Sequence, residues 1–133
     1  MSPAYVDSSA LVKLIVREAE TDELRRYVDS AGPLTSSILA TVEVSRVLAR
    51  VAPESTAAMT AVFEALAVVA FDARIAARAS ALSPAGLRTL DAIHLATALE
   101  LGDELTAFVS YDERLSAAAR NLGLPVVAPA GGS

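Results

Sequence analysis

Short apolar runs alternate with longer segments of helical periodicity along the whole chain. Four of these runs indicate strands: Pro3–Val6, Val68–Phe71, Thr106–Val109 and Val126–Ala128. A fifth segment, Leu34–Ser37, is mostly Thr and Ser and suggests a short strand or a strand-like entry. Most of the segments between them repeat apolar residues every three or four positions, as amphipathic helices do. Strands that alternate with helices pair in parallel through right-handed crossovers. The pattern therefore predicts an α/β protein, a three-layer α/β/α sandwich with a central, mostly parallel sheet.

The segment from Leu90 to Leu101 is apolar around nearly its whole circumference, which predicts a buried helix. Thr89 is the expected N-cap and Gly102 the expected end of this helix. Its first turn holds Asp91 among apolar neighbours. An isolated buried carboxylate is costly unless it is paired or bound to a metal. Asp91 is therefore expected to have partners elsewhere in the chain.

Three other acids occupy matching places in the predicted fold. Asp7 follows the first strand, Asp112 follows the fourth, and Glu43 lies near the beginning of a helix over residues 38–50. The functional crevice of a parallel sheet lies beyond the carboxyl ends of its strands. We therefore expect one acidic cluster on this rim: Asp7, Glu43, Asp91 and Asp112.

Each of these acids also has a purely structural interpretation. Asp7 is a suitable helix cap, and Glu43 can form an exposed ion pair with Arg46 three residues later. Asp72 also follows a strand, but the helix that begins after it explains it as an N-cap, so we leave it out of the cluster.

Four carboxylates in one crevice repel one another, and a divalent cation removes that conflict. Oxygen ligands without a Cys or His partner suit Mg²⁺ or Mn²⁺. Such an ion, with a water molecule and a substrate phosphate, can carry out phosphodiester hydrolysis. The cluster therefore predicts metal-dependent chemistry on a phosphate ester.

Composition limits the class of protein. The 133 residues are expected to form one domain over 1–128 and a flexible tail over 129–133. There is no cysteine, no secretory signal is evident, and no apolar run is long enough for a bilayer. We therefore expect a soluble, cytoplasmic protein. The formal net charge of −5 argues at face value against binding nucleic acid by bulk electrostatics. If four acids form one metal site, the remaining charge is −1, so charge alone decides little.

Four sequence motifs in this chain resemble those of the PIN-domain family, in the same order and spacing. They are Val6-Asp7-Ser8-Ser9-Ala10-Leu11, Glu43 followed by Arg46, Leu90-Asp91-Ala92-Ile93-His94-Leu95-Ala96-Thr97-Ala98, and Ser110-Tyr111-Asp112-Glu113-Arg114-Leu115. The small size without appended domains is similar to that of VapC-type toxins. The resemblance implies a Mg²⁺- or Mn²⁺-dependent endoribonuclease, the toxin of a type II toxin–antitoxin pair. It further implies inhibition by a VapB-type antitoxin, and a homodimer.

The resemblance also implies roles for individual residues. The four acids match the family's catalytic and metal-binding quartet. Ser110 matches a hydroxyl residue two positions before the last acid, where it would orient Asp112 or a water molecule. Ser8 would assist at the first acid, although the helix that begins there explains it equally well. Candidates for contacts with RNA phosphate, or for solvated ion pairs, are Arg46, Arg50 and Arg114.

Two other classes of function remain open. A signalling receiver domain also gathers acids and Mg²⁺, but it should carry paired acids after its first strand and a lysine after its last. Here Asp7 is followed by Ser8-Ser9, and Lys13 is the chain's one lysine. The other class is a non-catalytic protein whose acids bind a basic partner. His94 is interpreted as a packed residue of the buried helix rather than a metal ligand.

Overall fold

Five parallel strands form one sheet in the order β3-β2-β1-β4-β5 in this computed structural model, which describes residues 2–131. The strands are β1 (Ala4–Val6), β2 (Leu34–Ser37), β3 (Ala67–Val69), β4 (Ala107–Val109) and β5 (Val126–Val127). Each strand overlaps one of the five segments expected to be strands. The predicted α/β fold with a parallel sheet is therefore confirmed.

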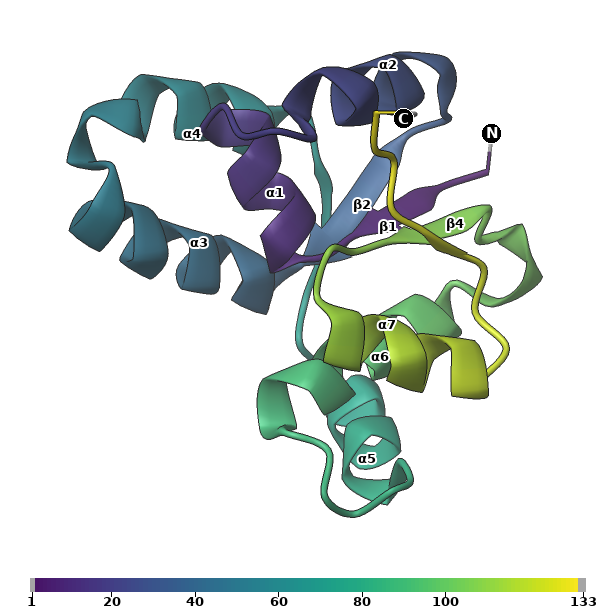
Figure 1. Cartoon of the computed structure of the whole chain (residues 1–133). Helices are drawn as coiled ribbons and strands as arrows, with labels where there is room; N and C mark the ends of the chain where they lie inside the picture. The colour runs from purple at the N-terminus through teal and green to yellow at the C-terminus, as the bar shows by residue number, and fades with distance from the viewer. Residues whose placement is uncertain (1, 132–133) are drawn as a thin grey trace.

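Helices connect the strands and cover both faces of the sheet (Figure 1). In the described part of the chain they are α1 (Ser8–Ile15), α2 (Thr21–Ser30), α3 (Ile38–Val51), α4 (Thr56–Glu64), α5 (Ala73–Ala81), α6 (Thr89–Glu100) and α7 (Glu113–Asn121), with short 3₁₀ turns η1 (Pro53–Ser55) and η2 (Gly102–Glu104). α1 to α4 lie on one side of the sheet, and α5 to α7 lie on the other.

The two central strands, β1 and β4, supply both hydrophobic cores. Successive side chains of a strand point to opposite faces, so Ala4 and Val6 pack with α1, α2 and α3, whereas Tyr5 packs with α6 and α7. β4 alternates in the same way, with Phe108 on the side of Tyr5. Burial of β1 and β4 on both faces fixes their register, and with it the position of the residues that follow them.

The connection order places a topological switch point between β1 and β4. From β1 the chain moves outward to β2 and β3, and it then returns to β4 on the other side of β1. The crossovers leave a crevice beyond the carboxyl ends of the two strands at such a point. Asp7 and Asp112 lie in the segments that follow β1 and β4.

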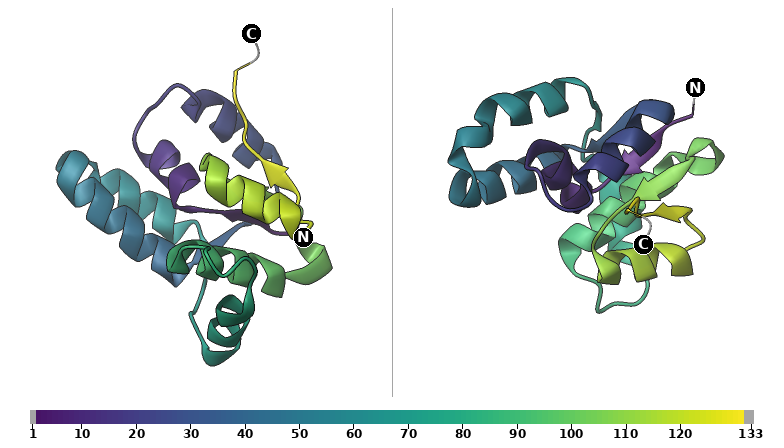
Figure 2. Two further views of the ribbon diagram at one scale, coloured as in Figure 1. Left: turned by 60° about the horizontal axis from the view of Figure 1, so that its bottom comes forward. Right: turned by 45° about the horizontal axis from the view of Figure 1, so that its top comes forward.

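α3 and α4 lie side by side and project away from the sheet (Figures 1 and 2). In α3 the buried side chains are Ala40, Val44 and Leu48, and in α4 none is buried. Val51, at the end of α3, is 62 % exposed, because the helix has left the sheet by that point. α4 packs on the core through partly buried side chains only.

The central helix α6 is buried from Ala92 to Ala98, as its composition predicts. The expectation that Thr89 caps it is wrong, because the N-cap position belongs to Arg88 and no side chain caps the helix there. Thr21, at the start of α2, does not cap that helix either. Its hydroxyl accepts from the Glu18 amide and donates to the Lys13 carbonyl, which joins α2 to the end of α1.

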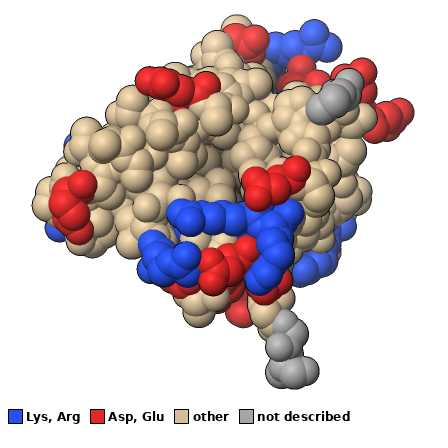
Figure 3. Space-filling model, turned by 90° about the horizontal axis from the view of Figure 1, so that it is seen from above, with Lys and Arg blue, Asp and Glu red and all other residues tan. Residues whose placement is uncertain are grey.

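No helix within residues 2–131 is both long and apolar enough to cross a membrane. In the view from above, basic and acidic side chains lie beside one another and form no continuous basic surface (Figure 3). The predicted C-terminal tail begins with Pro129, whose carbonyl accepts a hydrogen bond from the Tyr111 hydroxyl at 2.6 Å. Residues 132 and 133 of that tail lie outside the described residues.

Candidate active site

The site forms where two neighbouring strands of the sheet end. Asp7 follows β1 directly, and Ser110 and Asp112 follow β4. Val6 pairs with Val109 across the two strands, and the Asp7 amide donates to the Val109 carbonyl at 3.1 Å. The sheet register therefore brings the segments after β1 and β4 together, although they are about a hundred residues apart in the chain.

Two serine hydroxyls join these segments. Ser110 Oγ donates to Asp7 Oδ2 at 2.6 Å and accepts from the Asp112 amide at 3.1 Å. Ser9 Oγ makes the reciprocal link, because it donates to Asp7 Oδ1 at 2.7 Å and accepts from the Tyr111 amide at 2.9 Å. Each hydroxyl donates its hydrogen to Asp7 and accepts a hydrogen bond from a backbone amide of the segment after β4. The two loops therefore hold one another in place.

Asp7 is the most deeply buried of the four acids, with 2 % of its surface exposed. Burial raises the pKa of its carboxyl group, and hydrogen bonds from Ser110, Ser9 and the Ala10 amide offset only part of that rise. The Ala10 bond also makes Asp7 the N-cap of α1, as its structural interpretation predicted. The ionised form of this carboxylate therefore carries an electrostatic cost that a bound cation would reduce.

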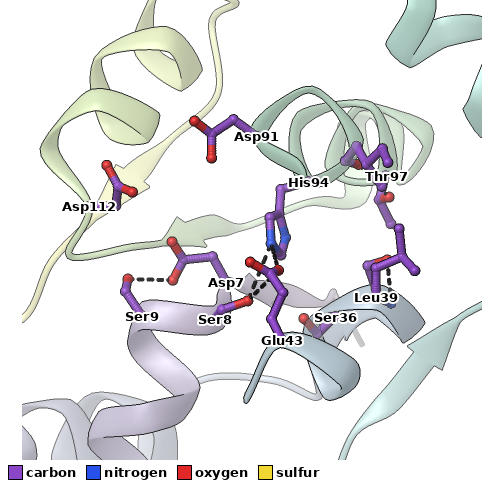
Figure 4. Close-up of polar contacts among 12 residues, drawn as sticks. Asp7, Ser8, Ser9, Ser36, Leu39, Glu43, Asp91, His94, Thr97 and Asp112 are labelled. Atoms are coloured by element: carbon purple, nitrogen blue, oxygen red, sulfur yellow. Dashed lines mark hydrogen bonds and ion pairs between the residues drawn. The ribbon is translucent and has the colours of Figure 1, made fainter. Parts of the chain in front are cut away.

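Glu43 reaches the site from α3. Its Oε1 accepts from Ser8 Oγ at 2.7 Å and from His94 Nε2 at 2.8 Å. Burial acts to raise the pKa of Glu43, but the hydrogen bonds from His94 and Ser8 outweigh it, so the pKa is lowered. The alternative of an exposed ion pair with Arg46 is wrong, because Glu43 points to α6 and α1 instead (Figure 4).

Asp91 and Asp112 share one cation, the guanidinium group of Arg88. Arg88 Nε lies 3.1 Å from Asp91 Oδ2, and Arg88 Nη2 lies 3.5 Å from Asp112 Oδ2. Asp112 also caps α7, where its Oδ1 accepts from the Leu115 amide at 3.0 Å. Arg88 further contributes to the lowered pKa of Glu43. One side chain thus compensates charge on three of the four acids.

The structure brings all four predicted acids to one region, between α1, α3, α6 and the start of α7 (Figure 4). Sequence reasoning missed two polar residues there, Ser9 and Arg88. It also assigned the wrong partner to Ser8, which donates to Glu43 and not to Asp7. The spacing of Arg88, three residues before Asp91, was a usable signal. The choice between Ser8 and Ser9 had none, because it depends on the direction in which α1 leaves the sheet.

Both ring nitrogens of His94 make hydrogen bonds. Its Nδ1 lies 2.6 Å from the Tyr5 hydroxyl, and its Nε2 contacts Glu43. It is 3 % exposed, as expected for a packed residue of the central helix. The expectation of packing alone is nevertheless incomplete, because the ring connects a core tyrosine of β1 to one of the four acids.

The donor set suits a small divalent cation, since the four carboxylates offer oxygen ligands only. Within residues 2–131, no three acidic or histidine side chains meet the geometry of a metal site as they stand. Mg²⁺ typically takes only one or two protein carboxylates and completes its shell with water and substrate phosphate. The Arg88 guanidinium already places positive charge between Asp91 and Asp112. The residues therefore fit an ion whose charge would replace that of Arg88.

A groove of about 350 Å³ continues from Glu43 along α3. It is lined by Leu39, Val42, Glu43, Arg46, Val47, Arg50 and Leu90. Two of the three arginines considered for RNA binding, Arg46 and Arg50, therefore lie in one groove with an acid of the cluster. The third, Arg114, is exposed on α7. The groove combines an apolar floor with two positive charges.

Comparison with protein families finds a match to the PIN domain over residues 4–121. Ribonuclease VapC46 of Mycobacterium tuberculosis is 46 % identical over 129 residues, which cover 97 % of this chain and 99 % of that protein. Ribonuclease VapC35 of the same species is also 46 % identical over 129 residues, covering 94 % of this chain and 96 % of the relative. The family match extends across all four acids.

Two solved structures share the fold. The crystal structure of Mycobacterium tuberculosis VapC20, described as a sarcin–ricin loop cleaving toxin, has a TM-score of 0.76 at 21 % identity. The match covers 95 % of this chain and 99 % of that one. A toxin–antitoxin complex from Klebsiella pneumoniae has a TM-score of 0.70 at 24 % identity and covers 95 % and 97 % of the two chains. At 21 % and 24 % identity, the structural similarity establishes a shared fold only.

Proposed function

Because the chain belongs to the PIN-domain family, we propose that it is an endoribonuclease, the toxin of a type II toxin–antitoxin pair. Its catalytic residues would be Asp7, Glu43, Asp91 and Asp112, acting with Mg²⁺ or Mn²⁺. The observation that carries the proposal is the convergence of these four acids at the switch point of the sheet. Ser110 and Arg88 link Asp7, Asp112 and Asp91. Glu43 reaches the same region from α3, where Ser8 and His94 hold it. A protein that needed only helix caps would not bring acids from four separate segments together.

The chain's own residues would bind and orient the reactants. Asp7, Asp91 and Asp112 would hold the cation, and Glu43 would complete the acidic pocket from α3. When bound, the ion would supply an activated water molecule and positive charge for the phosphate during hydrolysis. Ser110 and Ser9 would keep Asp7 in place, and Arg88 would be free to contact a phosphate once a cation neutralises Asp91 and Asp112.

The groove along α3 supports the remaining parts of the proposal. Arg46 and Arg50 would contact RNA phosphates beside the pocket. Its apolar floor, with Val42 and Leu90 exposed, is also suited to an amphipathic segment of a VapB-type antitoxin. Such a segment would cover Glu43 and keep RNA from the acids. We further propose that the chain forms a homodimer.

A cleavage assay on the purified chain tests the catalytic proposal. RNA should be cut in Mn²⁺ or Mg²⁺ and not in EDTA, and Asp7→Asn or Asp91→Asn should abolish cutting while the fold survives. Asp72→Asn is the matched control, since Asp72 also follows a strand but only caps α5. Equal cleavage by all three variants would contradict the site assignment.

Expression of the chain alone tests the toxin and partner proposals. Inducible expression should arrest growth and produce discrete new RNA 5′ ends, which sequencing would locate. Co-expression with the product of the neighbouring gene should restore growth and give a larger complex on size exclusion. A monomer that ignores that product would contradict the antitoxin and dimer proposals, and growth arrest without new RNA ends would contradict the substrate class.

A further inference from the structure

A buried chain of hydrogen bonds runs from the middle of the sheet to Glu43. The Tyr5 hydroxyl on β1 contacts His94 Nδ1 at 2.6 Å, and His94 Nε2 contacts Glu43 Oε1 at 2.8 Å. Tyr5 is 0 % exposed and His94 3 %, so the bond between them is shielded from bulk water, whereas the bond from His94 to Glu43 is part-buried. Figure 4 shows the imidazole ring of His94 directed from α6 toward the Glu43 carboxylate.

Packing fixes the orientation of this ring. His94 lies edge-on to Tyr5, with ring centroids 5.9 Å apart and an interplanar angle of 78°. Tyr5 in turn stacks on Phe108 of the neighbouring strand, at 5.3 Å and 6°. The imidazole is therefore held against two central strands of the sheet, which are the best-packed elements of the fold.

Glu43, in contrast, reaches the site with a long side chain from α3, a helix that extends beyond the sheet with α4. A glutamate side chain on such a helix loses considerable rotamer entropy when it is held in one place. Ser8 and His94 both donate to the same oxygen, Oε1. The other oxygen, Oε2, thereby stays available to the acidic pocket.

We propose that His94 is a positioning residue, which transfers the rigidity of the sheet to Glu43 through Nε2–H. This inference rests on the proposed function, because it assigns Glu43 a role at the metal site. His94 itself touches no reacting atom, since both of its ring nitrogens are engaged in the buried chain.

The partners decide which nitrogen carries the hydrogen. A carboxylate can only accept, so the ring nitrogen that faces Glu43 Oε1 must be the donor. In the neutral imidazole, Nδ1 then presents its lone pair to the Tyr5 hydroxyl, 2.6 Å away, and the phenol O–H donates to it. Outer hydrogen bonds of this kind orient metal-site ligands and set their tautomers.

The first test reads the tautomer directly. His94 is the only histidine of the chain, so ¹⁵N-histidine labelling of the whole protein gives the ring signals of this one residue. A long-range ¹H–¹⁵N spectrum should show hydrogen on Nε2 and a bare Nδ1. Glu43→Ala should give a mixture of tautomers, because the acceptor that holds the hydrogen on Nε2 is lost. Hydrogen on Nδ1 in the parent protein, or an unchanged spectrum in Glu43→Ala, would overturn the inference.

The second test measures what the ring does for Glu43. His94→Leu should weaken Mn²⁺ binding, measured by titration without RNA, by about 10- to 100-fold, the range typical of outer-sphere residues. kcat for RNA cleavage should fall with it while KM changes little. His94→Gln should restore most of both, because its amide N–H can occupy the place of Nε2–H. An equal loss in His94→Gln and His94→Leu would mean that only packing matters.

A double-mutant cycle separates positioning from general damage to the fold. In a Glu43→Ala background, His94→Leu should cause no further loss of Mn²⁺ affinity, because its effect passes through Glu43. A loss of the same size in both backgrounds would overturn the inference. The proposed function has a separate readout: if the parent chain cuts no RNA in Mn²⁺, that proposal fails, whereas the tautomer spectrum still decides the role of His94.

Discussion

Removal of one buried hydroxyl should disturb both strand ends of the site. Ser110 is 0 % exposed, and its Oγ links the Asp7 carboxylate to the Asp112 amide. A hydrogen bond to a charged group contributes about 1.5–3 kcal/mol and a neutral one about 0.5–1.5 kcal/mol. We therefore expect Ser110→Ala to lower the free energy of unfolding by about 2–4 kcal/mol. This is a large part of the roughly 5–15 kcal/mol that stabilises a typical domain.

The same substitution should weaken metal binding. The hydrogen bond from Ser110 opposes the rise in the pKa of Asp7, so its loss should raise that pKa further and favour the protonated form over the cation complex. Asp112 also loses the contact that fixes its backbone. Mn²⁺ affinity at neutral pH should fall by about 10- to 100-fold. Urea unfolding in EDTA and Mn²⁺ titration by calorimetry measure the two effects separately.

Ser116→Ala is the matched control for Ser110→Ala. Ser116 is also a buried serine, 5 % exposed, but it lies on α7 and makes no side-chain hydrogen bond to the acids within the described residues. It should unfold at nearly the parent urea concentration and bind Mn²⁺ with parent affinity. If Ser110→Ala behaves like this control in both assays, the link between Asp7 and Asp112 is not important to the site.

Three further predictions concern charge at the site. Asp7→Asn should stabilise the metal-free protein, because the pKa of Asp7 is raised in the folded state. The gain in stability should grow as pH rises between the unfolded and folded pKa values of Asp7, so it should be larger at pH 7 than at pH 4 in urea unfolding with EDTA. An equal or reversed effect at the two pH values would contradict this. Arg88→Ala should tighten Mn²⁺ binding severalfold in a titration without RNA, because the guanidinium no longer competes for Asp91 and Asp112. Arg114→Ala, the control, should leave Mn²⁺ binding unchanged. Weaker binding in Arg88→Ala would show that the guanidinium and the metal ion do not compete. The double variant Arg46→Ala, Arg50→Ala should weaken RNA binding and reduce its salt dependence without changing Mn²⁺ affinity. Arg26→Ala, which removes an ion pair to Glu23 on α2, should change neither RNA binding nor its salt dependence. An unchanged salt dependence in the double variant would mean that RNA binds elsewhere.

Local sequence pattern sufficed for most of the fold. The strands are short apolar runs between helices, and burial of α6 follows from its uniform apolar surface. Asp72 caps α5 as its position predicts, through the Ile75 amide. Thr21 and Thr89 resemble caps equally well in the sequence but do not cap. The hydroxyl of Thr21 is used by a longer-range contact to the Lys13 carbonyl, which no local rule anticipates.

The proximity of the four acids could be predicted from the sequence, because the carboxyl ends of parallel strands lie at one edge of the sheet. Their hydrogen-bond partners could not be predicted, because each partner depends on tertiary packing. Glu43 has an obvious local partner in Arg46, yet it contacts His94, 51 residues further along the chain. Arg88 reaches Asp112 only because the ends of β4 and the start of α6 converge. Sequence rules therefore identify the candidate metal ligands, whereas the residues that orient these ligands can be identified only from the structure.

Anomalous diffraction from a crystal of the chain grown with Mn²⁺ tests the central claim most directly. The claim predicts an anomalous peak in the pocket formed by Asp7, Asp91 and Asp112, with the Arg88 guanidinium displaced from the two carboxylates that it contacts here. A crystal of protein that cleaves RNA in Mn²⁺ but shows no peak there, or shows one only elsewhere, would contradict it.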